Sequence, residues 1–226
     1  PDVIHITSTP GLSELQTYRF WYKTVLTVHD PFTHSGETNF NNEWKRLLAF
    51  HVCRRLILLN NIQIESFKKH YHINNSKIYT NRLGSYDCLE YLSSMKPLNL
   101  TLPQNYILFF GHFSPYKGID VLCKAMTKVH KSHPEVKCII AGNGNLNFDI
   151  TPYQNLDYII LKNEFIETDH LAALISRSLF TVCPYKDATQ SGVVSSSFAL
   201  NKPVIATRVG GLPEAVTDGE KGLIAE

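Results

Sequence analysis

Apolar and polar positions alternate along the second half of the chain in a pattern that predicts a parallel sheet covered by helices. Short apolar runs rich in β-branched and aromatic residues are separated by longer stretches with helical periodicity. This order is typical of an α/β domain, because parallel strands need a long crossover that is usually a helix. The predicted strands are residues 106–110, 136–141, 158–161, 179–182 and 203–207, and the predicted helices are 118–130, 168–178, 192–200 and 212–216.

The first half repeats the pattern less completely. It predicts strands at 3–6, 25–28, 56–59 and 77–80, and helices at 43–53 and 62–70. Residues 1–83 are therefore predicted to be the back part of a Rossmann-like domain, and residues 105–226 a second such domain. Residues 84–104, with Pro97 and Pro103, are predicted to link them. Because the chain lacks an initiator Met and stops where the pattern of a further strand starts, we expect a fragment whose first domain is truncated and whose last lacks its end.

Composition narrows the class of protein. The formal charge is +2 and the basic residues are scattered, so nucleic-acid binding is disfavoured. The sequence contains no apolar run of the ~20 residues that span a bilayer, and no signal peptide can be read. Of the five cysteines, Cys123, Cys138 and Cys183 sit in apolar stretches, and the set lacks metal-like spacing. We therefore expect a cytoplasmic protein with free thiols.

The first candidate site directly follows the strand at 106–110. Gly111 permits a sharp turn at the carboxyl end of that strand, where open α/β sheets bind ligands. Lys117 then lies near the start of the next helix, where a compact ammonium can neutralise a phosphate. Taken alone, the stretch is better described as a loop lysine followed by a helix-starting glycine.

Two more loops have the same position between a strand and a helix. Residues 189–194 place Gln190, Ser191, Gly192 and Val193 where open backbone amides can bind an anion, although simple N-capping by Ser191 is an alternative. Residues 207–214 carry paired glycines before a helix start. Three such loops on one sheet together indicate an anion-binding site.

The order of these motifs resembles the retaining glycosyltransferases of family 4. The pattern is Gly-His-x4-Lys-Gly, Ile-Ile-Ala-Gly-Asn-Gly, Pro-x5-Gln-Ser-Gly-Val-Val and Pro-Val-Ile-Ala-Thr-x-Val-Gly-Gly-Leu-Pro-Glu-x-Val-x-Asp-Gly-x-x-Gly-Leu-Ile. The resemblance is strong from residue 106 to the end and looser over residues 1–81. It implies the GT-B fold, two Rossmann-like domains that face a cleft, with the acceptor-side domain first and the nucleotide-sugar donor bound mainly by the second.

Site roles follow from the resemblance position by position. Lys117 matches the lysine that contacts the donor diphosphate, and the segment 163–166 matches the loop that meets the base. His112 stands where the family commonly has an arginine, and a neutral imidazole is a weaker ligand for an anion. The loops and the resemblance together give these candidate donor-binding residues: Gly111, His112, Gly142, Gly144, Phe165, Ile166, Gln190, Ser191, Gly192, Val193 and Ser196.

The sequence also departs from the family. Two glutamates eight positions apart are typical, the second of which binds the donor ribose, and their places hold Ala188 and Ser196. Ser196 is then the candidate substitute, and ribose recognition is unassigned.

In the first half, His29 ends a strand and resembles the family's histidine that faces the donor sugar. A strand-end histidine is suited to hydrogen-bond a sugar or phosphate near neutral pH, although it can equally tie a loop. We therefore assign His29 and Lys117 as the candidate catalytic residues. His34 and Glu37 lie just beyond and are expected to meet the acceptor, whereas His5 matches a histidine that is more often structural.

The resemblance implies transfer of a sugar from a nucleoside diphosphate sugar to an acceptor hydroxyl with retention of anomeric configuration and without a cofactor or metal. By family habit, the acceptor is a glycan or lipid-linked molecule at the inner face of the cell membrane, where peripheral membrane contact is expected. We expect the fragment alone to bind donor without completing transfer. Two alternatives stay open, a GT-B nucleotide-sugar epimerase and a non-catalytic nucleotide-sugar-binding module. A dinucleotide oxidoreductase is disfavoured, because Gly142-Asn143-Gly144 lacks the third glycine.

Overall fold

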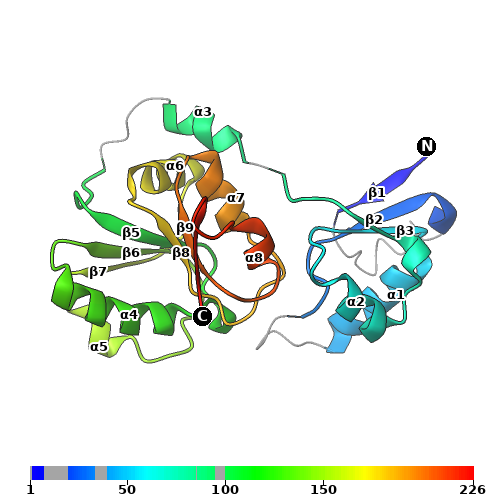
Figure 1. Cartoon of the computed structure of the whole chain (residues 1–226), viewed down its shortest axis with the longest axis horizontal. Helices are drawn as coiled ribbons and strands as arrows, with labels where there is room; N and C mark the ends of the chain where they lie inside the picture. Colours follow the sequence, from blue (N-terminus) through cyan, green and yellow to red (C-terminus); the bar gives the residue numbers. More distant parts are fainter. Residues whose placement is uncertain (1, 8–19, 34–39, 85, 95–99) are drawn as a thin grey trace. The chain divides into compact units, whose positions relative to one another are not determined.

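The computed structural model describes residues 2–7, 20–33, 40–84, 86–94 and 100–226. The chain divides into two compact units, one of Pro1–Leu83 with Ala188–Gln190 and one of Gly84–Asp187 with Ser191–Glu226. Each unit is built on a parallel sheet (Figure 1). Both halves therefore have the α/β architecture that the sequence predicts.

The first unit contains a four-stranded parallel sheet in the order β1-β2-β3-β4. Its elements are β1 (Ile4–Ile6), β2 (Thr24–Val28), α1 (Phe40–Val52), β3 (Arg55–Leu58), α2 (Ile64–Tyr71), the 3-10 turn η2 (Asn75–Lys77) and β4 (Ile78–Thr80). Each strand predicted in this half is present, with ends that differ by at most one residue. Both helices follow the predicted ranges to within three residues.

The core of the first unit lies between its sheet and its helices. Phe50 of α1 packs edge-on against Phe67 and Tyr71 of α2, with ring centroids 5.1 and 4.9 Å apart. The alternate residues Leu26 and Val28 of β2 are buried against the same cluster. Alternation along β2 thus turns one face of the strand to the helices, as the pleat of a strand requires.

The second unit contains a six-stranded parallel sheet in the order β10-β9-β8-β5-β6-β7. Its strands are β5 (Tyr106–Phe110), β6 (Lys137–Gly142), β7 (Ile159–Asn163), β8 (Thr181–Cys183), β9 (Val204–Thr207) and β10 (Gly222–Ala225). Its helices are α3 (Cys88–Ser94), α4 (Ile119–Ser132), α5 (Thr151–Gln154), α6 (Thr168–Arg177), α7 (Gly192–Ala199) and α8 (Leu212–Ala215), with the 3-10 turn η3 (Pro115–Lys117) before α4. The predicted strands and helices are all present, with ends that differ by at most two residues.

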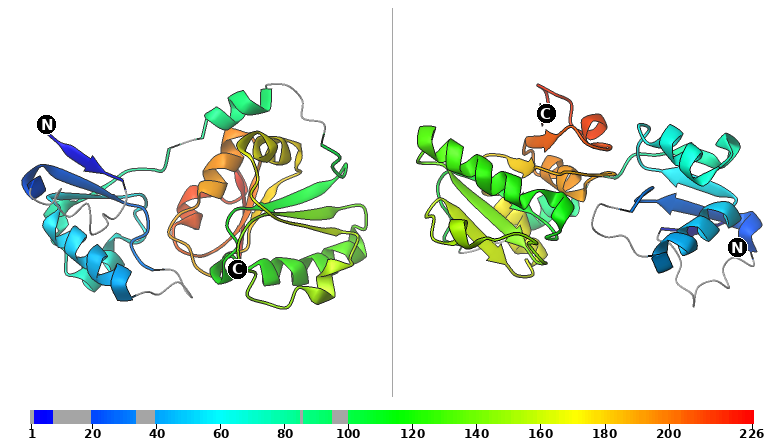
Figure 2. Two further views of the ribbon diagram at one scale, coloured as in Figure 1. Left: turned by 180° about the vertical axis from the view of Figure 1, so that it is seen from behind. Right: turned by 90° about the horizontal axis from the view of Figure 1, so that it is seen from below.

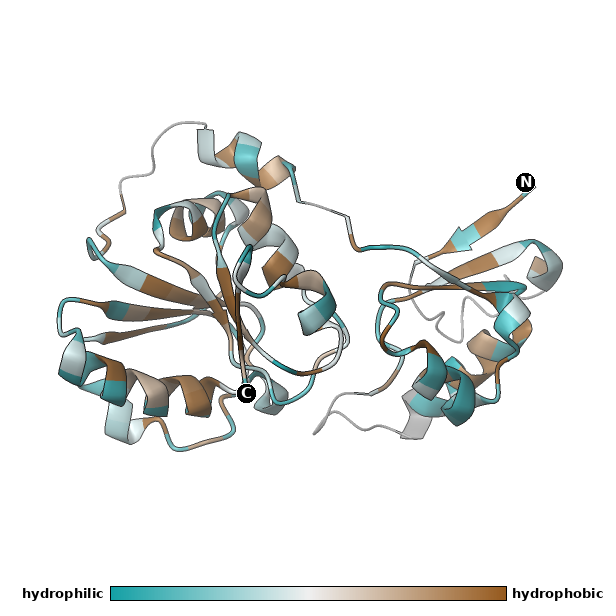
Figure 3. Cartoon of the chain, viewed as in Figure 1, coloured by the Kyte–Doolittle hydropathy of each residue, from teal (hydrophilic) through white to brown (hydrophobic). Residues whose placement is uncertain are grey.

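Helices cover both faces of this second sheet. The views of Figures 1 and 2 place α4 on one face and α6 with α7 on the other. All five residues of β5 are buried, and Figure 3 shows the central strands as mostly apolar segments. A strand covered on both faces reads as a continuous apolar run, which is why Tyr106–Phe110 shows no alternation.

The segment predicted to join the two domains contains a helix. Helix α3 packs against α6 and α7 and buries Leu89. Pro97 and Pro103 both follow the end of α3, so neither interrupts it. The described residues of the 84–104 segment therefore belong to the second unit.

The five cysteines are free, and four of them are buried. Burial raises the pKa of the Cys53, Cys123 and Cys183 thiols to about 11 and that of Cys138 well above its usual range. Such thiols stay protonated at neutral pH and are poor nucleophiles. Cys88 is exposed at the start of α3.

We therefore expect a thiol reagent at pH 7.5 to modify Cys88 rapidly and the other four cysteines only after unfolding. Titration of the native chain should count about one fast thiol, and the Cys88→Ser variant should count none, because the buried thiols are protonated and inaccessible. A fast second thiol in the native chain would contradict the burial of the other four.

Candidate functional site

Strand order defines where a ligand fits in the second unit. From β5 the chain proceeds through β6 to β7 on one side, and from β8 through β9 to β10 on the other. The order therefore reverses between β5 and β8, which pair through Leu108 and Thr181. At such a reversal the loops after the two central strands diverge, and open α/β sheets bind ligands in the crevice outside their carboxyl ends.

The loop after β5 is held by backbone bonds to the neighbouring strand. The amide of Gly111 donates to the carbonyl of Ala141 at 3.0 Å, and the amide of Phe113 donates to that of Asn143 at 2.7 Å. The Phe113 ring is buried and anchors the loop in the core. Gly111 has φ 121°, a backbone angle that favours glycine.

Lys117 stands at the end of η3, close to the position that the sequence predicts. Its Nζ lies 3.9 Å from the ring centroid of Tyr185 and 4.9 Å from that of Tyr116. Gly118 follows with φ 66° and occupies the N-cap position of α4. A Cβ at Gly118 would lie 1.8 Å from the carbonyl oxygen of Pro184, so the loops after β5 and β8 approach each other closely here.

The glycines after β6 form the next side of the crevice. Gly142 has φ 146°, and a Cβ there would lie 1.9 Å from the carbonyl oxygen of Gly111. At Gly144 a Cβ would lie 3.0 Å from Cε1 of His112. The structure thus brings together four residues that the sequence assigned separately to the donor site.

The loop after β7 lies at the same carboxyl end of the sheet. The amide of Glu164 donates to the carbonyl of Gly142 at 2.7 Å. Phe165 is 72% exposed and Ile166 is half-buried. An exposed aromatic ring on this edge has the shape and chemistry to stack on a nucleobase.

Helix α7 presents its first turn to the crevice. Ser191 occupies the N-cap position, but its side chain makes no capping bond, so the N-capping predicted as an alternative is absent. Its Oγ instead lies 3.3 Å from the Tyr185 hydroxyl. The geometry of an α-helix leaves the amides of its first turn, including Gly192 and Val193, without intrahelical acceptors, which makes this helix start suited to an anion.

The other candidate residues near α7 are Val193, Ser196 and Gln190, and they differ in burial and contacts. A Cβ on Gly111 would lie 3.6 Å from Cγ2 of Val193, so α7 abuts the loop after β5. Ser196 is buried one turn inside α7. Gln190 is half-exposed and belongs, by its contacts, with the first unit.

One candidate residue of the first unit, His29, lines a hollow of that unit. His29 is exposed directly after β2 and lines a cavity of about 320 Å³ with Asp30 and Arg46. Arg46 donates to the backbone carbonyl of Asp30 and so holds the segment after β2. His5 shares a 2.8 Å hydrogen bond with the Thr27 hydroxyl across β1 and β2. His34 and Glu37 lie outside the described residues.

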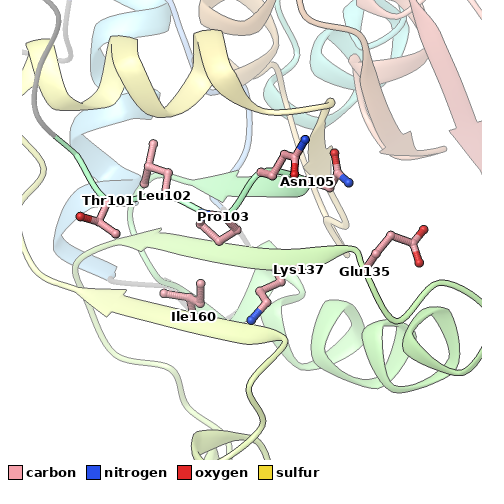
Figure 4. Close-up of a pocket in the computed structure, with 8 residues that line it drawn as sticks. Thr101, Leu102, Pro103, Asn105, Glu135, Lys137 and Ile160 are labelled. Carbon is pink, nitrogen blue, oxygen red and sulfur yellow. The ribbon is translucent and has the colours of Figure 1, made fainter.

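A second hollow, of about 490 Å³, lies at the opposite ends of the strands in the second unit. Asn105 precedes β5 and Lys137 begins β6, and both line it with Glu135 and Ile160 (Figure 4). The strand-end glycines and Lys117 are absent from this lining. We therefore place the candidate site at the carboxyl ends, where strand order and anion-binding groups coincide.

Two tyrosines near the crevice were not predicted from the sequence. Tyr185 follows β8 and lies beneath Lys117, and the hydroxyl of Tyr86 lies 3.4 Å from where a Cβ on Gly192 would be. The sequence did contain one signal for Tyr185, because an aromatic residue stands just after a buried strand at Pro184-Tyr185. Tyr86 carries no such local signal, because the segment around it has no clear periodicity.

The part of the chain that the structure describes contains neither a cluster of metal ligands nor a membrane-spanning helix. Within those residues, no three or more His, Cys, Asp or Glu side chains gather as a metal site would require. No described helix combines the length and apolar character of a membrane span.

The comparisons with known proteins agree with this geometry. A family model described as glycosyl transferases group 1 matches residues 104–226, more than half of the chain. An uncharacterized glycosyltransferase of Methanocaldococcus jannaschii is 29% identical over 201 residues, which are 80% of this chain and 54% of that protein. A D-inositol 3-phosphate glycosyltransferase of Corynebacterium efficiens is 29% identical over 143 residues, which are 59% of this chain and 34% of that protein.

Solved structures extend the similarity to nearly the whole chain. Sucrose-phosphate synthase from Thermosynechococcus elongatus matches with a TM-score of 0.73 and 19% identity, over 99% of this chain and 60% of that one. Anabaena HepE in complex with UDP matches with a TM-score of 0.73 and 17% identity, over 98% and 64%. The chain thus spans between a third and two thirds of the length of these four proteins. The GT-B fold predicted from the sequence is confirmed, and the family match shows that the chain belongs to the glycosyl transferases group 1.

Proposed function

We propose that this chain binds a nucleoside diphosphate sugar and takes part in transferring the sugar to an acceptor hydroxyl with retention of anomeric configuration. The observation that carries the proposal is that Lys117 and Ser191, the residue before α7, both contact Tyr185 next to the reversal of strand order. A cation and a helix N-terminus at one crevice suit the two charges of a diphosphate. That HepE was crystallised with UDP and with UDP-glucose supports this choice of ligand.

The proposed chemistry follows from charge. As the bond between the sugar and the diphosphate lengthens, negative charge grows on the leaving oxygen. Lys117 and the amides of Gly192 and Val193 would stabilise that charge from fixed positions, which is electrostatic catalysis by a preorganised site. We propose that these groups suffice without a divalent metal, so that transfer persists in EDTA.

The direct test is calorimetric titration of the chain with UDP, GDP, ADP and NAD. We expect saturable binding of one nucleoside diphosphate and none of NAD. With the corresponding nucleotide sugar, release of the diphosphate in the presence of inositol phosphate, glycan or lipid-linked acceptors would identify the acceptor. NMR of the product would give its anomeric configuration. Tight NAD binding without diphosphate binding would contradict the proposal. Donor binding without transfer to any acceptor, measured on the intact protein as well as on this chain, would favour the non-catalytic module.

His29 is proposed to act on the sugar and not on the nucleotide. It follows β2 and lines its own hollow with Asp30 and Arg46, so it lies at a strand end. We expect His29→Ala to lower kcat by roughly tenfold or more, as loss of a group that acts in the transition state does, with the Kd for the nucleoside diphosphate within about twofold. Kinetics and calorimetry on one preparation of the intact protein measure both.

A matched control for His29 is His51→Ala, which removes an exposed histidine from the last turn of α1. This variant should leave kcat and Kd unchanged. If His29→Ala raised Kd and spared kcat, the histidine would belong to nucleotide binding instead.

A further inference from the structure

Tyr185 makes contacts that none of the site roles above explains. It is the second residue after β8, and its side chain is 2% exposed. The Lys117 ammonium lies 3.9 Å from the centroid of its ring. A cation within about 6 Å of an aromatic face is attracted by the ring quadrupole. The buried ring is therefore a platform on which the ammonium rests.

The hydroxyl of Tyr185 contacts the second anion-binding element, the start of α7. It lies 3.3 Å from Oγ of Ser191, the residue before the first turn of α7. It also hydrogen-bonds the Cys183 thiol, and burial raises the pKa of the phenol well above its usual range. The phenol therefore stays protonated and available as a donor.

The backbone of Tyr185 is tied to a third loop. Its carbonyl accepts a hydrogen bond of 2.5 Å from the Thr207 hydroxyl at the end of β9. The three loops that the sequence singled out, after β5, β8 and β9, thus all contact this one residue. A ring fixed from three directions has little freedom to move, whereas a lysine has a flexible four-carbon stem.

We propose that Tyr185 is a positioning residue, whose ring holds the Lys117 ammonium and whose hydroxyl fixes Ser191 at the start of α7. The two anion-binding elements are thereby set before the ligand arrives, which lowers the ordering cost of binding. This role rests on the donor-binding function proposed above. Tyr116 offers Lys117 a second ring at 4.9 Å, but it is half-exposed and belongs to the lysine loop itself.

The contact can be tested without any ligand. Protons above an aromatic ring are shifted upfield, so the Cε protons of Lys117 should resonate upfield of the other lysines in the carbon-13-labelled chain. The Lys117→Arg variant assigns that signal by removing it. We expect the shift to persist in Tyr185→Phe and to disappear in Tyr185→Leu. An ordinary lysine shift in the unsubstituted chain would overturn the inference.

The role in binding is tested by a double-mutant cycle with the nucleoside diphosphate that the chain binds among UDP, GDP and ADP. Tyr185→Leu should weaken binding by roughly tenfold, the size of a desolvated cation–π contact. In the Lys117→Ala background the same substitution should change Kd by less than about twofold, because its target is gone. Equal factors in both backgrounds would show a merely structural role and overturn the inference.

Tyr185→Phe separates the ring from the hydroxyl and guards against misfolding of the leucine variant. It keeps the platform and removes one neutral hydrogen bond, so binding should weaken by about fivefold or less. A larger loss in Tyr185→Phe than in Tyr185→Leu would overturn the role of the ring. If the unsubstituted chain bound none of the three nucleotides, the donor function would fail and the positioning role with it. If the unsubstituted chain bound the nucleotide but the effects of Tyr185→Leu and Lys117→Ala were additive, only the positioning role would be overturned.

Discussion

Replacing Lys117 with alanine is expected to weaken binding of the nucleoside diphosphate by about 10- to 100-fold, the range for loss of a hydrogen bond to a charged group. The ammonium is half-buried over two tyrosine rings, so solvent screens its charge less than that of a surface lysine. Calorimetry on the unsubstituted and substituted chains measures the change directly.

The same substitution should slow transfer at least as much as it weakens binding. Charge on the leaving diphosphate is greater in the transition state than in the bound donor, so a fixed cation stabilises the transition state more. In the intact protein we therefore expect kcat to fall together with kcat/KM in Lys117→Ala. A rise in KM with kcat unchanged would mean that the lysine binds the ground state and the transition state equally.

Lys124→Ala is the matched control for Lys117. Lys124 is exposed on α4, the helix that follows the crevice loop, and its removal changes the net charge by the same amount. It should leave Kd within about twofold at 0.15 M salt, where exposed charges more than about 8 Å apart are largely screened. Similar losses in the two variants would indicate an effect of net charge, and the diphosphate site would have to be placed elsewhere.

Hydrophobic periodicity was sufficient to predict the sheets, but it missed the short helices α3 and α5. Strand β5 is buried on both faces, so its uninterrupted apolar run identified it without ambiguity. Helix α3 has only seven residues, too few for a periodic signal, and its place is set by packing on α6 and α7. Its stability comes from tertiary contacts, which a sequence window does not contain.

The candidate site was likewise predictable where the requirement on a residue is local, and not where it depends on packing between distant residues. Glycines mark it in the sequence because Gly111, Gly142 and Gly144 need positive φ and lie against neighbouring residues, requirements that act locally. The contact between Tyr185 and Lys117 joins residues far apart in the chain and depends on β5 and β8 being neighbours. Strand order is decided by the global packing of the sheet, so the pattern of residues along the chain does not reveal such a pair.

The close approach of the two central loops makes Gly118→Ala a strongly destabilising substitution. Gly118 has φ 66°, and a left-handed angle costs a residue with a Cβ roughly 1–2 kcal/mol. The new Cβ would also lie 1.8 Å from the carbonyl oxygen of Pro184, and backbone has to move to relieve that contact. We expect a total loss of about 3 kcal/mol or more in the free energy of unfolding, in the range reserved for strain at special backbone positions.

Gly219→Ala separates the two causes, because Gly219 has φ 79° but no heavy atom of the described residues lies within 4 Å of where its Cβ would be. That variant should lose about 1 kcal/mol, the cost of the backbone angle alone. Urea unfolding of both variants gives the difference, which measures the steric contact between the loops after β5 and β8. The same displacement should carry Lys117 away from Tyr185, so Gly118→Ala should weaken nucleotide binding in conditions where it is still folded, whereas Gly219→Ala should not. Equal stability losses in the two variants would show that the loops yield easily, and a rigid, preset crevice would then be the wrong description of this site.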